Sequence, residues 1–182
     1  MLKTDRRTDR TRRDLLAAFR DELLERGFER MTVSDVIARA GVGRSTFYEH
    51  YRNKDDILRE SFAPIAAVLA GAVSESGPSP ALVHVVAHLR ENRRLTGTLL
   101  AATSREVIVS CLADLIEDRL PAQTTLPGSL LARFVAGAQF ALVEAWLDEK
   151  PPSSPAVVAA ALHASTVATV AALTRNVSLS RS

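Results

Sequence analysis

The stretch at residues 32–54, TVSDVIARAGVGRSTFYEHYRNK, constrains the fold more than any other part of this chain. Thr32 is a residue type preferred at helix N-caps, and Asp35 three positions later can complete a capping box. A first short helix is therefore expected to begin at Val33. Gly41 can adopt the positive φ that follows the last turn of a helix, so this helix is expected to end there.

A second short helix is expected to begin at Gly43 or Arg44. Phe47 and Tyr51 lie four residues apart, so they share one helix face and should turn toward the core. The residues that then point outward are polar, small or aromatic, which are the kinds that can enter a DNA groove. They are Arg44, Ser45, Tyr48, Glu49 and Arg52.

Two helices joined by a short turn that contains glycine form a helix-turn-helix unit, whose second helix places its N-terminal residues at base edges in the major groove. At that end Arg44 can make a bidentate contact to guanine, and the Thr46 hydroxyl can bond a base or a phosphate. The lack of bulk at Gly43 and Ser45 lets the backbone approach DNA. The groove candidates are Arg44, Ser45, Thr46, Tyr48 and Glu49, and the phosphate candidates are Thr32, Tyr48, His50 and Lys54.

A specific pattern of residues runs through this unit and a little beyond it. It consists of Thr32, Val36, Ala40-Gly41-Val42, Thr46-Phe47-Tyr48, His50-Tyr51, Asn53-Lys54 and Asp56-Ile57-Leu58. The pattern closely resembles the N-terminal domain of the TetR family of transcriptional regulators, over roughly residues 11–62. Two positions depart from the family: Ile37 replaces a customary alanine, and Gly43 stands where a serine or threonine cap is common.

The resemblance implies what this domain binds and how the rest of the chain acts on it. In the family, the lysine equivalent to Lys54 bonds a DNA phosphate. A pocket in the C-terminal bundle binds a small, often hydrophobic effector, and this binding re-spaces two DNA-binding heads so that they lose register with the operator. The family diverges beyond its N-terminal domain, so no residue of the pocket is carried over to this chain.

Composition favours an all-α fold, because 47% of the 182 residues are hydrophobic while only 5% are aromatic, which suits a core of Ala, Leu and Val. We expect an N-terminal three-helix helix-turn-helix DNA-binding domain at residues 1–54. A larger helical bundle for ligand binding and dimerisation should follow at residues 55–182, with about nine helices in total. Breaks rich in proline separate the bundle helices at residues 77–80, 121–128 and 151–155.

No run of about 18 uncharged apolar residues suits a membrane span, and the start of the chain lacks the apolar segment of a signal peptide. A cytoplasmic protein without membrane contact is therefore expected. The net charge of +2 is too small to predict nucleic-acid binding, but basic residues crowd the start of the chain. They form either a solvated tail or a helix start that contacts phosphates: Lys3, Arg6, Arg7, Arg10, Arg12 and Arg13.

The last two expected helices, residues 129–149 and 155–175, carry more apolar surface than one seam of a small monomer would cover. This surface is either plain core packing or an isologous four-helix interface between two copies, and we favour the interface. A two-fold dimer would also present two recognition helices to a palindromic site. The candidate interface residues are Phe134, Leu142, Trp146, Val158, Leu162 and Val170.

Polar side chains of the middle helices are candidates for contacting a small hydrophobic effector: His84, His88, Thr103, Arg105 and Gln139. His84 and His88 are spaced to share a metal ion, but no third ligand is spaced to join them. They are therefore either effector contacts or ordinary histidines, and neither a metal nor a cofactor is expected. The single cysteine, Cys111, lies in an apolar helical pattern and is either a buried side chain or a redox sensor.

The sequence lacks the motifs G-x-S-x-G, G-x-G-x-x-G and H-E-x-x-H and the P-loop, so we expect no catalytic residue and no enzymatic activity. It favours a homodimeric transcriptional regulator, a repressor that a small molecule releases from a palindromic DNA operator. Two alternatives remain. One is a DNA-binding regulator that is constitutive or controlled by a protein partner, and the other is a helical interaction protein without DNA binding.

Overall fold

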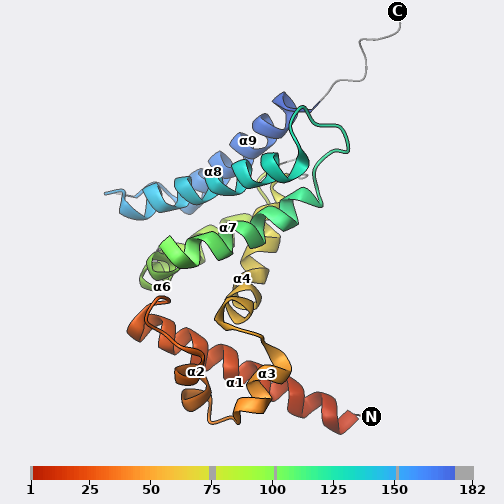
Figure 1. The fold of residues 1–182 in the computed structure, drawn as a ribbon. Helices are drawn as coiled ribbons and strands as arrows, with labels where there is room; N and C mark the ends of the chain where they lie inside the picture. The colour runs from red at the N-terminus through yellow and green to blue at the C-terminus, as the bar shows by residue number, and fades with distance from the viewer. Residues whose placement is uncertain (1, 74–76, 101, 151, 175–182) are drawn as a thin grey trace, which may run out of the picture. The chain divides into compact units, whose positions relative to one another are not determined.

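The computed structural model describes residues 2–73, 77–100, 102–150 and 152–174. Within these ranges it contains nine helices, which confirms the predicted all-α fold with an N-terminal helix-turn-helix and a larger helical bundle (Figure 1). The helices are α1 (Leu2–Arg26), α2 (Val33–Ala40), α3 (Arg44–His50), α4 (Lys54–Gly71), α5 (Pro80–Glu91), α6 (Arg93–Leu99), α7 (Ala102–Glu117), α8 (Gly128–Asp148) and α9 (Pro155–Ala172).

By their internal contacts the described residues form two compact units. The N-terminal unit comprises Met1–Phe62 together with Arg94–Ile108, and the C-terminal unit comprises Ala63–Arg93 together with Val109–Ser182. The functional division into residues 1–54 and 55–182 stays a prediction.

The core of the N-terminal unit holds the apolar faces of α1, α2 and α3. α1 ends at Gly27, which adopts φ 77°, and the next residue turns back so that the Phe28 ring meets the Phe19 ring edge-on at 6.4 Å between centroids. Both rings are fully buried, because the turn folds Phe28 onto the apolar stripe of α1. The largest buried side chains of this core are Leu15, Phe19, Leu23, Phe28, Met31 and Phe47.

A capping box fixes the start of α2, as predicted. The Asp35 backbone N–H donates to Thr32 Oγ1 at 3.2 Å, and the Thr32 backbone N–H donates to Asp35 Oδ2 at 2.9 Å. These bonds favour the ionised carboxylate, so they hold the pKa of Asp35 below its ordinary value, with the Thr32 side chain as the largest cause. α2 ends where Gly41 adopts φ 64° as its C-cap, which confirms the predicted stop.

Gly41 and Gly43 make a matched pair for testing this turn. A Cβ added at Gly41 would meet nothing within 4 Å, so Gly41→Ala is expected to cost about 1 kcal/mol of unfolding free energy from the left-handed backbone alone. Gly43 has φ −73° and a Cβ there makes ordinary contacts, so Gly43→Ser is expected to add a few tenths of a kcal/mol as a better N-cap. Urea unfolding of both variants checks the opposite signs, and equal losses would contradict this account.

The C-terminal unit is built on α5, α8 and α9, and α9 packs against both of the others. α8 and α9 lie side by side in Figure 1. A buried polar contact joins them, because Gln139 Nε2 of α8 donates to Thr166 Oγ1 of α9 at 2.9 Å. The start of α9 is defined by the Ser154 hydroxyl, which accepts a hydrogen bond from the Val157 backbone N–H at 3.4 Å.

We predicted that no stretch of the chain suits a membrane span. Judged by length and hydropathy alone, this prediction is wrong. α8 and α9 each contain an 18-residue window that passes this test, with mean hydropathies of 1.4 and 1.6. Alanine-rich core helices of bundles pass it too, so the windows are weak evidence for a membrane. In these windows 44% and 28% of the residues are buried, so much apolar surface of the two helices is left uncovered.

Candidate nucleic-acid interface

α3 is anchored to the N-terminal unit by two aromatic side chains. Phe47 is completely buried, and Tyr51, the C-cap of α3, is nearly so. Their ring centroids lie 5.7 Å apart, and the Phe47 ring also meets the exposed Tyr48 ring edge-on at 5.4 Å. The predicted inward face is therefore confirmed, and it fixes which side of α3 faces outward.

The outward face of α3 begins with Arg44 at its N-terminus. Arg44, Ser45, Tyr48 and Glu49 are exposed, and Thr46 is half-buried. The Arg44 guanidinium carbon lies 5.9 Å from the centre of the Tyr48 ring, a cation–π arrangement allowed by their i, i+4 spacing. A guanidinium held beside the ring has fewer rotamers to lose when it contacts a base or a phosphate.

α2 is held against α1 by a group of charged residues that the sequence did not reveal. Glu22 is buried, and its Oε1 accepts a hydrogen bond from Arg39 Nε at 2.6 Å. Arg26 Nε lies 2.8 Å from Glu22 Oε2 as an ion pair without hydrogen-bond alignment.

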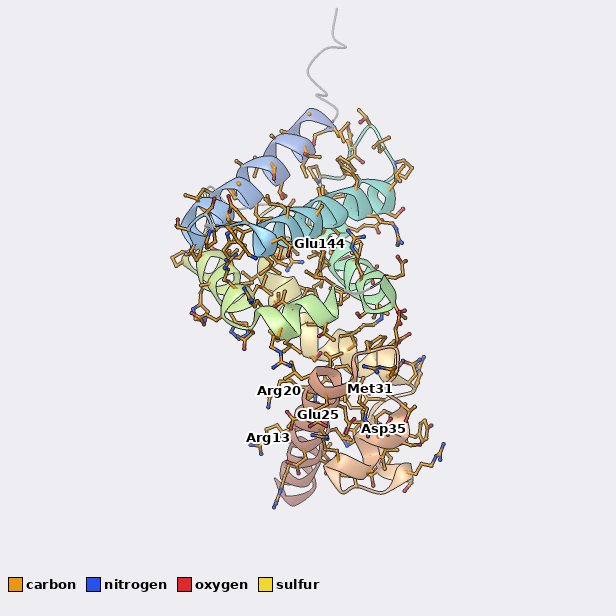
Figure 2. All side chains as sticks on the ribbon, turned by 90° about the vertical axis from the view of Figure 1, so that its left-hand side faces the viewer. Arg13, Arg20, Glu25, Met31, Asp35 and Glu144 are labelled. Atoms are coloured by element: carbon orange, nitrogen blue, oxygen red, sulfur yellow. The ribbon has the colours of Figure 1, made fainter. Side chains whose placement is uncertain are left out.

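Arg39 also reaches the exposed Glu25, whose Oε1 accepts from Arg39 Nη1 at 2.8 Å. The bonds to Glu25 are the largest cause of the raised pKa of Arg39 and of the lowered pKa of Glu25. Glu25 of α1 and Asp35 of α2 are labelled in Figure 2, and Arg26 Nη1 reaches Asp35 Oδ1 at 3.5 Å. α2 is thus tied to α1 from both of its ends.

The Lys54 amine contacts the turn between α1 and α2 in the chain without DNA. Lys54 Nζ donates to the backbone carbonyl of Phe28 at 2.7 Å and also lies 3.3 Å from the carbonyl of Met31 and 3.5 Å from that of Glu29. It also lies 4.5 Å from the centre of the Phe28 ring. The three donors of the ammonium group are directed at the turn between α1 and α2. The phosphate contact of Lys54 stays a prediction.

Thr32 and His50, the other two phosphate candidates on the edges of this surface, have different surroundings from Lys54. The Thr32 hydroxyl takes part in the capping box and also donates to Asp35 Oδ2 at 2.7 Å, although Thr32 itself is exposed. His50 is half-buried beside Tyr51, with 6.1 Å between the ring centroids. Their roles toward DNA stay predictions.

Arg12 belongs to the cluster of basic residues near the start of the chain, and it has a partner inside the N-terminal unit. Its Nε donates a short hydrogen bond to Glu60 Oε1 of α4. The Tyr51 hydroxyl is buried and has no hydrogen-bond partner within the described residues. Burial, followed by the charge of Glu60, raises the pKa of the Tyr51 phenol, so this side chain is neutral at physiological pH.

The predicted effector residues are divided between the two units, and their role stays a prediction. The Thr103 hydroxyl donates to Glu29 Oε1 at 2.9 Å, which places it in the N-terminal unit, and Arg105 lies in the same unit. His84 and His88 are exposed on α5, and His88 Nδ1 lies 3.2 Å from Asn92 Nδ2. Gln139 alone is buried. No group of three metal-ligating side chains occurs in the part of the chain that the structure describes.

The predicted interface residues divide into covered and exposed ones. Trp146, Val158, Leu162 and Val170 are at most 6% exposed, because they pack inside this chain's own C-terminal unit. Their place in a dimer interface stays a prediction. Leu142 is half-buried and Phe134 is 57% exposed, so the surface that a second copy can reach is the Phe134 side of α8.

A hollow of about 310 Å³ lies between α8 and α9, and the sequence alone did not reveal it. Its walls include Leu142, Ala145 and Trp146 of α8 with Val157, Val158 and Ala161 of α9. None of the five predicted effector residues lines it. One sequence pattern could have located this hollow: alanines that lie opposite larger side chains on the facing turns of the two helices.

Comparison with known proteins shows which family the N-terminal part of the chain resembles. Residues 15–61 match the family model described as bacterial regulatory proteins, tetR family. Residues 15–61 are therefore similar to the DNA-binding domain of the TetR family. This match covers α2 and α3 and confirms the resemblance seen in the sequence. TetR-family members are transcriptional regulators, which agrees with the prediction that the chain is not an enzyme.

Individual relatives support the same assignment. The uncharacterized HTH-type transcriptional regulator YxbF from Bacillus subtilis is 33% identical over 110 residues, which cover 59% of this chain and 27% of YxbF. The chain therefore spans little more than a quarter of that relative.

Solved structures match over nearly the whole chain. A TetR transcriptional regulator from Streptococcus agalactiae 2603V is 25% identical with a TM-score of 0.61, covering 90% of this chain and 97% of its own. A TetR-family regulator from Streptomyces coelicolor A3 has a TM-score of 0.65 at 21% identity, covering 90% of this chain and 96% of its own, and thus has the same fold.

Proposed function

We propose that this chain is a cytoplasmic repressor of the TetR family that binds a palindromic operator in double-stranded DNA as a homodimer and is released by a small hydrophobic effector. The observation that carries the proposal is the outward face of α3. Phe47 and Tyr51 anchor this helix from behind, while Arg44, Ser45 and Tyr48 are exposed at the front. A short, rigid helix with a polar front is what insertion into a major groove requires.

The residues of this face take different roles in the proposal. Arg44 lies in the first turn of α3, where a side chain reaches base edges, and the guanidinium can pair with guanine O6 and N7. Ser45, Thr46 and Glu49 complete the groove surface. Tyr48, His50 and Thr32 supply phosphate contacts, which position the domain without reading sequence.

Dimerisation is supported by the uncovered apolar surface of α8 and α9. Leu130, Phe134 and Val157 are each more than half exposed, which is unusual for large apolar side chains gathered on two neighbouring helices. Covering them with a second copy would create a two-fold dimer with two α3 helices. Such a dimer reads half-sites about 34–36 Å apart, or a multiple of this spacing.

Release by an effector is supported by Gln139. Its Oε1 is buried and has no hydrogen-bond donor among the residues described, while its Nε2 is already bonded to Thr166. A buried acceptor without a donor costs about 1–3 kcal/mol, which a ligand N–H or O–H group would offset. Gln139 is therefore the foremost effector candidate, and His84, His88, Thr103 and Arg105 are secondary.

The proposal is tested by selecting bound duplexes from a random pool with the purified chain at two salt concentrations. We expect a palindrome to be enriched, with affinity that falls steeply as salt rises because phosphate contacts release counterions. If no sequence is enriched at low salt by a verified dimer, the chain does not bind an operator, and the alternative of an interaction protein is favoured.

Arg44→Ala tests the assignment of base reading on the selected operator. We expect the variant to lose about tenfold in affinity and to tolerate any base pair at one position of each half-site. The matched control is Arg52→Ala, which removes an exposed arginine outside α3 and should weaken all sequences equally. Binding measured on the operator and on single-base variants separates the two. An equal, sequence-independent loss in both variants would contradict the role given to Arg44.

A further inference from the structure

The exposed face of α8 is an apolar stripe with its largest side chains at one end. Leu130 is 53% and Phe134 is 57% exposed, and both lie in the N-terminal half of the helix. The stripe then continues toward the C-terminus with small exposed residues at spacings of three and four, which keeps it on one face. These residues are Ala138, Ala141 and Ala145.

The hollow between α8 and α9 lies at the other end of this stripe. Ala145 belongs to both, and the remaining walls are mostly apolar side chains of α8 and α9, with Glu149 and Ser153 at the turn between them. Its volume of about 310 Å³ is at the lower end for small-molecule pockets, which is enough for one aromatic side chain. α8 therefore carries a projecting ring in one half and a matching depression in the other.

The hollow is held open by hydrogen bonds around the turn that joins α8 to α9. Trp146 Nε1 donates to the Ser153 carbonyl at 2.8 Å, and Arg90 Nη1 donates to the Trp146 carbonyl at 2.8 Å. The Ser153 backbone N–H donates to Glu149 Oε2 at 2.7 Å. Trp146, Glu149 and Ser153 all line the hollow, so its walls are fixed before anything enters it.

The positions of the ring and the hollow satisfy the condition for a self-complementary interface. In an isologous dimer, if residue i contacts residue j, then j contacts i. Phe134 and Ala145 are eleven residues apart, about 16 Å along the helix at a rise of about 1.5 Å per residue. If two α8 helices pair antiparallel about an axis level with residues 139–140, each Phe134 lies level with the hollow of the other copy.

The charged side chains beside the stripe fit the same two-fold symmetry. Arg133 and Glu144 are exposed, also eleven residues apart, and lie on the same edge of α8 beside the apolar stripe; Glu144 is labelled in Figure 2. The antiparallel pairing that seats Phe134 also brings Arg133 of one copy within two residues, about 3 Å along the helix, of the level of Glu144 of the other. The charges therefore favour a second copy in the antiparallel register.

We propose that the hollow between α8 and α9 receives the Phe134 ring of a second copy of this chain and thereby sets the register of the dimer. This inference rests on the proposed homodimer and adds its contact residues. Two such insertions related by the two-fold axis would bury both exposed rings. Phe134 would then be an energetic centre of the interface, because aromatic side chains that fill pockets on a partner dominate binding.

Disulfide trapping tests the register. In a Cys111→Ser background, we would prepare one variant with Phe134→Cys and another with Ala145→Cys, mix them, and oxidise the mixture. The proposed pairing brings these two positions level on packed helices, with Cα atoms at about 4–7 Å, where a disulfide forms. Each variant alone places its two cysteines about 16 Å apart along the helices, too far to bridge. We expect a disulfide-linked heterodimer by intact mass from the mixture and little from either variant alone.

Sedimentation of the reduced proteins separates the failure of this inference from that of the proposed function. A reduced dimer whose mixed variants do not cross-link faster than the single ones would overturn the register and leave the homodimer standing. A wild-type chain that stays monomeric would overturn both.

Alanine substitution supplies a second measurement that needs no cross-link. We expect Phe134→Ala to raise the dimer dissociation constant about 30-fold. The control is Leu126→Ala, which removes an exposed leucine outside the stripe and should leave the dissociation constant unchanged. Circular dichroism establishes that both variants fold, since both side chains are exposed in the single chain. Equal dissociation constants for Phe134→Ala and wild type would overturn the inference.

Discussion

Replacing Lys54 by methionine is expected to lower the free energy of unfolding by about 2 kcal/mol. Methionine keeps the length of the side chain but removes the ammonium group, which bonds the Phe28 carbonyl at 2.7 Å and lies 3.3 Å from that of Met31. Hydrogen bonds from charged donors contribute about 1.5–3 kcal/mol, and the contact with the Phe28 ring adds to this. Urea unfolding followed by circular dichroism measures the loss.

The same variant decides whether Lys54 binds DNA. A lysine that neutralises a phosphate contributes about one to the slope of log affinity against log salt, and its loss lowers that slope. Because the Lys54 amine is directed at backbone carbonyls, we expect the slope to stay unchanged at a temperature where the variant is folded. Arg52→Ala is the control, since that exposed side chain is free to approach phosphates. A slope reduced by one together with unchanged stability would show that Lys54 contacts phosphate after all.

Replacing Glu22 by glutamine is expected to cost about 2 kcal/mol of unfolding free energy. The Glu22 side chain is 4% exposed and has Arg39 Nε at 2.6 Å and Arg26 Nε at 2.8 Å. Removing one partner of a buried ion pair costs about 3–5 kcal/mol, and this figure is reduced here because Arg39 and Arg26 are 31% and 52% exposed and can be solvated. Glutamine preserves the shape, so the loss reports the charge.

Glu25→Gln provides the matched control. It changes the other carboxylate that Arg39 contacts, but the Glu25 side chain is 57% exposed, where ion pairs contribute little. Thermal melting of the two variants should show a clear loss for Glu22→Gln and almost none for Glu25→Gln. Equal melting temperatures for the two variants would show that burial of Glu22 does not matter to the stability of the N-terminal unit.

Lys54→Met and Glu22→Gln both bear on DNA recognition, because Lys54 and Glu22 help to place α3. This helix has no side-chain cap of its own, and it contacts α2, which Glu22 and its partners hold against α1. Lys54 fixes the turn that leads into α2 from the other side. A groove contact is sensitive to shifts of a fraction of an ångström, so we expect these residues to act on recognition by positioning α3.

Local structure of the N-terminal unit was predictable from the sequence because it depends on neighbours within four residues. The capping box of Thr32 and Asp35 and the left-handed cap at Gly41 each follow from the chemistry of a few side chains and backbone groups. The inward direction of Phe47 and Tyr51 follows from helical spacing. The resemblance to the TetR family was also predictable from the sequence, because the family's pattern lies in these same residues.

The tertiary structure alone decided what the charged and apolar side chains contact. Lys54 lies 26 residues from Phe28 in sequence and Arg12 lies 48 from Glu60, and no short-range pattern reports such pairs. The apolar residues of α8 and α9 look alike in sequence, yet Trp146 and Leu162 are covered by this chain while Phe134 is not. Helical spacing gives the face on which a residue lies, but burial and partners depend on which helices pack against that face, and only the folded chain determines this.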